Sequence, residues 1–210
     1  MTALESGRKS DWMDGFLFVG NHLALDFLNT CPVQNGETVE LLPDFDALLR
    51  WFRAADVLSS REAASLQQLW GESARAQHVV EAVRELRERL RKEVLARERG
   101  GTVHRAALDE LNHLMAEHPM LTRLKTSGNA STTELWFDPR QPEDLFAPLA
   151  HSAATLSDAD RNRVRKCGQC VLHFHDTSKK GTRRWCSMQL CGNRLKVAAY
   201  ATRRRTIDRN

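Results

Sequence analysis

The chain has 210 residues, of which 41% are hydrophobic and 28% are charged, and its formal net charge is +4. A chain of this length can bury a core and form one domain with a small appendage. It contains no run of about 18 apolar residues, which a membrane-spanning helix needs, and its first residues lack the apolar core of a signal peptide. Composition therefore excludes an integral membrane class and predicts a cytoplasmic protein.

Most of the first half has helical patterning. The apolar spacing of HLALDFLNT predicts a short buried helix. Asp44 is suited to cap a helix in FDALLRWFRAA, and Ser59 with Glu62 has the capping-box pattern of the next helix. Residues 78–101 place valines and leucines on one stripe and end in two glycines, which predicts a long packing helix with a solvated outer face.

Further along, residues 106–119 predict an amphipathic helix that stops before a proline. TTELWFD at residues 132–138 is the best internal strand candidate, and we expect it to pair with FLFV at residues 16–19. A last helix is expected over about residues 143–156. The predicted fold class is therefore mainly α (α+β), a helical domain with a small β element.

Charge divides the chain near residues 157–163. Residues 161–210 hold 14 lysines and arginines against 2 acidic residues, whereas residues 1–160 are net acidic. We therefore expect a mostly helical, regulatory domain over 1–160 and a separate basic domain over 161–210. So strong a basic bias favours a polyanionic partner, with a merely solvated charged surface as the alternative.

Three polar residues interrupt the first apolar helix. Asp26, Asn29 and Thr30 form a candidate binding site for a small-molecule effector, and the alternative is that they only end and cap the helix. Cys31 follows with no cationic neighbour in sequence, so we expect an ordinary thiol without a redox role.

The four remaining cysteines have the spacing of a metal site. Cys167-x2-Cys170 and Cys186-x4-Cys191 can bring four thiolates to one Zn²⁺. Two disulfides would fit a cytoplasmic chain badly, and a thioredoxin-like redox pair would need a βαβ pattern that the sequence lacks. His173 and His175 lie near enough to substitute as ligands, but we expect them on one strand face outside the metal shell.

Four protein ligands leave no open position on zinc. We therefore expect one structural ion, whose loss unfolds residues 160–210 and leaves the helical domain intact. Gly168 and Gly192 are expected to give the backbone the positive φ that folding around the ion would need. Asp176 and Arg194 are expected to form a buried or semi-buried ion pair, and contact with DNA is the alternative.

A helix is expected after the last cysteine, with one face directed outward to DNA. Its cations would meet phosphates, and its polar side chains would reach base edges in the major groove. The basic turn before Cys186 would add phosphate contacts. The residues expected to bind nucleic acid are Lys179, Lys180, Arg183, Arg184, Asn193, Lys196, Tyr200, Arg203, Arg204 and Arg205.

The segments FHDTS, RRWCSM and CGNRLKV resemble the CGNR zinc finger, over roughly residues 160–205. LALDFLNT and ELNHLMAEHP are similar to the ABATE domain that is usually found with that finger. The resemblance implies a bacterial, DNA-binding transcription regulator, sometimes described as stress-induced. It also implies a four-cysteine finger of treble-clef or knuckle type, a short hairpin and a helix, with the four cysteines as zinc ligands.

Two classes of function stay open. In the first class, the finger would bind DNA and the helical domain would regulate that binding. In the second class, the finger would bind RNA or an acidic protein. The sequence holds no Gly-x-Ser-x-Gly, phosphate-loop or His-Glu-x-x-His motif, so we expect no enzyme. Because one small finger covers few base pairs, we expect a homodimer on a two-fold operator.

Overall fold

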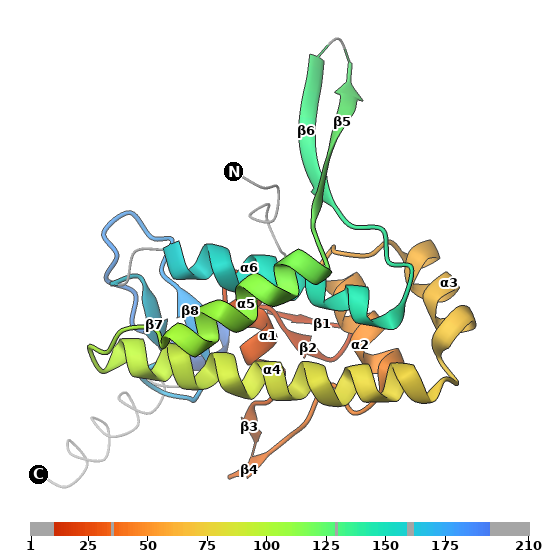
Figure 1. Cartoon of the computed structure of the whole chain (residues 1–210). Helices are drawn as coiled ribbons and strands as arrows, with labels where there is room; N and C mark the ends of the chain where they lie inside the picture. The colour runs from red at the N-terminus through yellow and green to blue at the C-terminus, as the bar shows by residue number, and fades with distance from the viewer. Residues whose placement is uncertain (1–10, 35, 129, 159–161, 194–210) are drawn as a thin grey trace, which may run out of the picture.

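A computed structural model describes residues 11–34, 36–128, 130–158 and 162–193. In that part of the chain, no helix is both long enough and apolar enough to cross a membrane. The helices are α1 (Leu23–Leu28), α2 (Phe45–Ala54), α3 (Ser60–Trp70), α4 (Ala74–Glu98), α5 (Arg105–Glu117) and α6 (Phe146–Asp158), with short helical turns at Pro142–Leu145 and Met188–Gly192. The expected mainly helical fold with small β elements is confirmed (Figure 1).

Local sequence signals set the helix ends. The Asp44 carboxylate accepts a hydrogen bond from Ala47 N at 2.8 Å, which caps α2. Ser59 and Glu62 form the reciprocal capping box of α3. Helix α4 begins at Ala74, one residue after its Ser73 cap and four residues earlier than expected, and it ends just before Gly100, whose φ is +89°.

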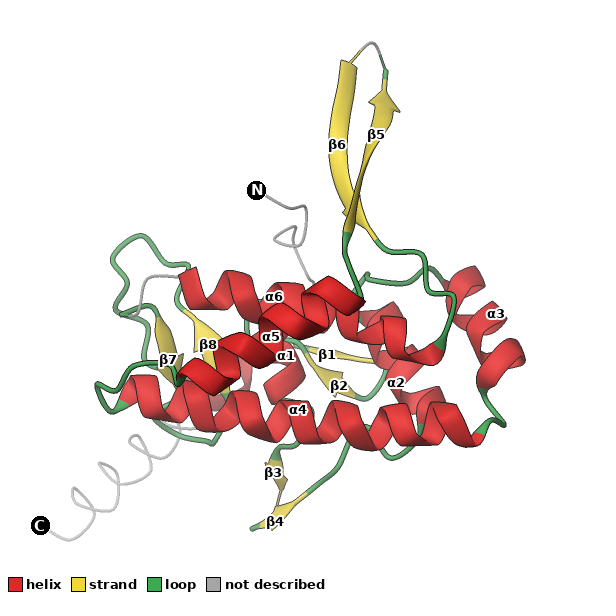
Figure 2. Ribbon diagram, in the orientation of Figure 1, coloured by secondary structure: helices red, strands yellow, loops and turns green. Residues whose placement is uncertain are grey.

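Within the described ranges, the strands form four separate antiparallel hairpins (Figure 2). They pair β1 (Trp12–Met13) with β2 (Phe16–Leu17), β3 (Val33–Gln34) with β4 (Glu37–Thr38), β5 (Leu121–Ser127) with β6 (Ala130–Trp136), and β7 (Val164–Lys166) with β8 (His173–His175). The expected pairing of 132–138 with 16–19 is wrong. Each segment instead pairs with its neighbour in sequence, because closing a two-residue loop costs less entropy than joining distant segments.

The largest apolar cluster of the described residues lies between α2, α3, α4, one face of α1 and the first turns of α6. Trp51 is fully buried there, with its ring 5.1 Å from that of Phe52 and 5.7 Å from that of Phe27. All six residues of α1 are buried, and this short helix lies between α4 and α6 (Figure 1). Helix α1 therefore lies where the helical body meets the C-terminal hairpin β7–β8.

Candidate metal centre and its surroundings

The four C-terminal cysteines come together in one cluster. Their Sγ atoms all lie within 4.8 Å of one another. The Sγ atoms of Cys170 and Cys186 are 3.7 Å apart, and those of Cys186 and Cys191 are 3.6 Å apart. Zn–S bonds of about 2.3 Å in a tetrahedron place sulfurs about 3.8 Å apart, so the cluster has the dimensions of a zinc site with four cysteine ligands.

The first cysteine pair lies in a tight backbone turn. Cys167 N donates to Leu172 O at 2.8 Å and Gly168 N donates to Arg184 O at 3.0 Å. The expected positive φ is not found at Gly168 or Gly192. Close packing explains the glycine at position 168 instead. A Cβ there would lie 3.1 Å from the Trp185 ring, so only glycine lets the turn approach the tryptophan this closely.

The second pair flanks the start of a helical turn. Ser187 Oγ accepts hydrogen bonds from Gln189 N at 3.0 Å and Leu190 N at 3.2 Å, which caps the turn that carries Cys191. The Arg183 side chain lies before Cys186: its Nε donates to Trp185 O at 2.8 Å, its Nη2 bonds Cys186 O, and its guanidinium lies 4.9 Å from the centre of the Phe174 ring. Arg183 therefore supports the cysteine turn.

The buried carboxylate of Asp176 holds the loop between the two pairs. It is fully buried and accepts hydrogen bonds from Ser178 N at 3.0 Å and Arg183 N at 2.8 Å. Burial opposes its ionisation, but these bonds outweigh burial and keep the pKa of Asp176 below its usual value. The expected partner, Arg194, lies outside the described residues, and Arg165 is the cation near this carboxylate, at 4.0 Å.

The electrostatics of the cluster call for a cation. The hydrogen bond from Cys186 lowers the pKa of Cys170 to about 5, so one thiolate forms readily. That same hydrogen bond, together with burial, raises the pKa of Cys186, and burial with the charge of Cys170 raises the pKa of Cys191 to about 12. Four thiolates so close can ionise together only around a positive ion.

The donor set decides what that ion does. Four soft thiolates are the ligand set of structural Zn²⁺ and fill its tetrahedral shell, so the cluster is that of one structural zinc. His173 and His175 are not members of the cluster. His173 is buried, with its Nε2 3.8 Å from the carboxylate of Glu98 in α4.

The cysteine cluster shares its apolar core with the N-terminal segment. Leu17 and Val19 pack with Leu172, Phe174 and the buried cysteines in one cluster. Strand β8 is held at its outer edge by the same region, because His175 N donates to Gly20 O at 2.7 Å and Asn21 Nδ2 donates to His175 O at 2.9 Å. FLFVG thus provides a wall of the finger, a contact that sequence reasoning missed.

The three polar residues of α1 and its end are buried and hydrogen-bonded. Asp26 Oδ1 accepts from Gly20 N at 2.7 Å, and a Cβ at Gly20 would lie 2.7 Å from Asp26 N. Asn29 bonds the backbone of His173, and Thr30 Oγ1 donates to Phe27 O at 2.7 Å and accepts from Arg87. These contacts join the helix to the finger and to α4, and they occupy groups that an effector would need.

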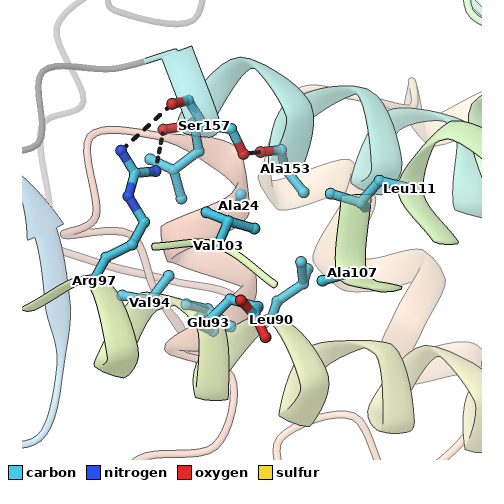
Figure 3. Close-up of a pocket in the computed structure, with 12 residues that line it drawn as sticks. Ala24, Leu90, Glu93, Val94, Arg97, Val103, Ala107, Leu111, Ala153 and Ser157 are labelled. Carbon is cyan, nitrogen blue, oxygen red and sulfur yellow. Dashed lines mark hydrogen bonds between the residues drawn. The ribbon is translucent and has the colours of Figure 1, made fainter. Parts of the chain in front are cut away.

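A narrow cavity lies between α1, α4, α5 and α6. Figure 3 shows Leu90, Val94 and Leu111 among its lining residues, with Arg97 at one end. Arg97 donates to the carbonyls of Leu156 at 3.2 Å and Ser157 at 3.4 Å. The cavity volume is about 30 Å³, which is room for about two water molecules, less than an organic effector needs.

The residues expected to bind nucleic acid lie partly within and partly outside the described residues. Lys179, Lys180 and Arg184 are exposed beside the cysteine cluster, and Asn193 is exposed after its last helical turn, whereas Arg183 is half-buried in the contacts above. Lys196, Tyr200, Arg203, Arg204 and Arg205 lie outside the described residues, as does the helix expected there.

Two family models match the chain. The ABATE model, described as "Putative stress-induced transcription regulator", is similar to residues 21–160. The CGNR zinc finger model is similar to residues 163–204, which include all four clustered cysteines. No curated protein matches the chain.

Proposed function

The chain belongs to the ABATE family, whose description is "Putative stress-induced transcription regulator", and it carries a CGNR zinc finger. From this premise we propose that the finger binds DNA. The observation that carries this proposal is the charge of residues 161–210, where 14 cationic residues face 2 acidic ones. Such a surface attracts phosphates and releases their counterions on binding. The zinc holds the finger in shape and takes no part in chemistry.

The contacts fall into two kinds. We propose that the exposed Lys179, Lys180 and Arg184 meet phosphates, together with the cations near the C-terminal end. Arg183 is not among them, because its guanidinium bonds two carbonyls beside Cys186. Asn193, Lys196, Tyr200 and Arg203 are the proposed base-reading residues, since amide and guanidinium groups can bond base edges in the major groove.

The proposed role of the helical body is to hold and orient the finger through α1 and the FLFVG segment. The two families that the chain matches are regulator and zinc-finger domains rather than enzymes. We therefore propose that the chain catalyses no reaction. A regulator of this kind acts where the DNA is, in the bacterial cytoplasm.

A binding series at several salt concentrations tests the proposal. We expect duplex DNA to bind with a slope of log K against log salt of about −4 to −5, because about five cations replace condensed counterions. Replacing Arg203, Arg204 and Arg205 together by alanine should flatten the slope by about two to three units. Asn193→Ala or Lys196→Ala should instead weaken a preferred sequence by about 1–3 kcal/mol.

The matched control removes three exposed cations of the helical body, Arg61, Arg105 and Arg140, and we expect it to leave the slope unchanged. Structured RNA and single strands complete the series, with zinc content checked for every variant. The absence of duplex binding at low salt would contradict the proposal. Tighter binding to RNA or to an acidic protein than to duplex DNA would favour the alternative function, in which the finger binds one of these partners.

A further inference from the structure

The hairpin of β5 and β6 stands away from the helical body as a two-stranded ribbon (Figure 1). Each strand has seven residues, and seven residue pairs join them without a bulge, from Leu121 opposite Trp136 to Ser127 opposite Ala130. Residues 121–126 are all exposed. An isolated two-stranded ribbon in water is only marginally stable, so a ribbon of this length with exposed side chains points to an interaction.

One face of the ribbon satisfies its own charges. Arg123 Nε donates to the directly opposite Glu134 carboxylate at 2.6 Å, and Lys125 Nζ lies 3.2 Å from the same carboxylate. The Arg123 guanidinium also lies 4.8 Å from the centre of the Trp136 ring. This face therefore offers little unbalanced charge to a nucleic acid.

The other face carries no charged side chain. Antiparallel pairs lie on a common face, so this face holds the pairs Thr122 with Leu135, Leu124 with Thr133 and Thr126 with Ser131. Leu124 is 76% exposed and Leu135 is 37% exposed. A threonine and leucine surface of this kind suits another β-strand surface without charge repulsion.

The two edges of the ribbon differ in protection. Natural sheet edges are commonly blocked by lysine, proline or a bulge. Strand β5 carries Arg123 and Lys125, whereas β6 reads ASTTELW, with no basic residue and no proline. Glu134 is the single charge on β6, and its partners lie on β5. Strand β6 is thus the open edge.

Register shows which groups this edge presents. The pair Ser127 and Ala130 flanks a two-residue loop, and Gly128 has the φ of +60° that a type I′ turn requires. Such a flanking pair is hydrogen-bonded, and bonded pairs alternate with unbonded ones along the ribbon. Thr133 is therefore in an unbonded pair with Leu124, so its N–H and C=O point outward, at the middle of β6.

We propose that β6 pairs with β6 of a second copy of this chain, antiparallel about a two-fold axis at Thr133, and joins the two ribbons into a four-stranded sheet. Pairing over the full strand places Thr132 opposite the partner copy's Glu134 position, and Ser131 opposite its Leu135 position. No like charges meet.

The same operation on β5 would be unfavourable. Full-length pairing of two β5 strands is centred on Leu124, the middle residue, and it sets Arg123 directly opposite Lys125 of the other copy, twice. Like charges directly opposite each other destabilise a strand pair. The charge pattern therefore selects β6 over β5 as the dimer edge.

The contact is small. Seven residues per copy bury less than the about 1,200 Å² typical of stable interfaces, so we expect a weak dimer whose population rises with concentration. Binding of two copies to one duplex would strengthen it through effective concentration. The inference itself does not depend on DNA binding.

Sedimentation velocity of the zinc-loaded full chain, over about 1–100 µM, tests the inference. We expect a reversible monomer–dimer equilibrium for the wild type. Thr133→Pro removes an outward N–H and should weaken dimerisation at least about tenfold while it leaves the ladder to β5 intact. Leu124→Pro, at the opposite outward position on β5, is the matched control and should dimerise like the wild type.

A cysteine pair gives a second measurement. The paired Thr133 Cα atoms would lie about 5.5 Å apart, within the range of about 4.4–6.8 Å that a disulfide spans. Thr133→Cys should therefore form a disulfide-linked dimer under mild oxidation, and Leu124→Cys should not. A wild type that is monomeric throughout, an unchanged Thr133→Pro dimer, or equal losses from Thr133→Pro and Leu124→Pro would each overturn the inference.

Discussion

The side-chain amide of Asn29 bonds both backbone polar groups of His173. Asn29 Oδ1 accepts from His173 N at 3.0 Å, and Asn29 Nδ2 donates to His173 O at 2.9 Å. A single side chain thus takes the place of a neighbouring strand along β8, whose other edge is bonded to β7. This bond ties the helical body to the finger, because Asn29 ends α1 and His173 lies only three residues after Cys170.

Asn29→Ala should destabilise the protein by about 2–4 kcal/mol, since it leaves a buried N–H and a buried C=O without partners. Urea unfolding of the zinc-loaded protein measures the change. Asn29→Asp should not restore stability, because it keeps the acceptor but places a carboxylate against the carbonyl of His173. Asn112→Ala, on the exposed side of α5, should change stability by less than about 0.5 kcal/mol. An Asn29→Ala effect as small as this control would show that the bond does not hold the finger.

A second prediction concerns the buried guanidinium of Arg87. Its Nη1 donates to Glu40 Oε1 at 2.8 Å and to Thr30 Oγ1 at 2.9 Å, and its side chain is 3% exposed. Burial opposes ionisation of Glu40, but the hydrogen bonds from Arg87 and Leu42 outweigh it and hold the pKa of Glu40 below its ordinary value of 4.5. Glu40→Gln removes one of the two carboxylates that pair with the buried cation and leaves only Glu88, whose Oε1 lies 3.1 Å from Arg87 Nε. We expect a cost of about 1–3 kcal/mol near neutral pH after allowance for the partly exposed carboxylate.

The pH dependence of this pair has a definite sign. A lowered pKa in the folded state stabilises the protein above the ordinary value of 4.5 and loses that effect as pH falls through the folded pKa. Wild type should therefore lose stability on acidification below about pH 4.5, and Glu40→Gln should lose less over the same range. Glu85→Gln, whose carboxylate is 70% exposed, is the control and should follow the wild type. Parallel pH curves for wild type and Glu40→Gln would contradict the assignment.

Local signals in the sequence were sufficient for several parts of the fold. Asp44, the Ser59–Glu62 box and the glycines after α4 act within one helical turn, and the cysteine spacing brings its ligands together over short loops. The β5–β6 hairpin also had a signal, Gly128 and an asparagine between two alternating segments, but only its second strand was recognised.

The docking of the finger could not be predicted in this way. Asn29 and His173 are 144 residues apart, and neither hydrophobic period nor turn chemistry links such positions. The FLFVG segment was expected to pair with a strand, because its apolar residues fit a strand as well as a finger wall. Leu17 and Val19 face the cysteines, whereas Phe16 and Phe18 face the helical core. This alternation places one short segment between two cores.

Cys31 should react slowly with thiol reagents in the native protein. Burial raises the pKa of its thiol, although the nearby charge of Arg87 acts in the opposite direction. The thiolate is the reactive form, so little of it is present at neutral pH. Alkylation followed by peptide mass spectrometry measures the rate, with Thr102→Cys in an exposed loop as the comparison. Reaction at Cys31 as fast as at the introduced cysteine would contradict this prediction.

Removal of zinc should loosen more than the finger. One Zn²⁺ per chain is expected in reduced protein, and its binding contributes about 10 kcal/mol or more in small fingers. The sequence alone predicts that loss of zinc leaves the helical domain intact. Because Leu17 and Val19 share the cysteine core, and Gly20 and Asn29 bond β8, we now expect chelation or Cys191→Ala to speed hydrogen exchange over residues 16–29 as well as over the finger.

The far helices provide the internal control for that experiment. Helix α2 contacts Phe18 and Phe27 through Trp51, but α3 and α4 also hold it in the larger cluster. The exchange of α2 and α3 should therefore change less than that of residues 16–29, and Cys31→Ala should retain zinc and native protection throughout. If chelation left hydrogen exchange over residues 16–29 unchanged while the finger unfolded, the stability of this segment would not depend on the finger, and the prediction would be wrong. If protein purified under reducing conditions held no zinc and contained a Cys167–Cys170 disulfide instead, the metal centre itself would be refuted. The expected result, a loss of protection that is smaller in α2 than over residues 16–29, would identify α1 and FLFVG as the segment through which the metal-bound finger is held to the helical body.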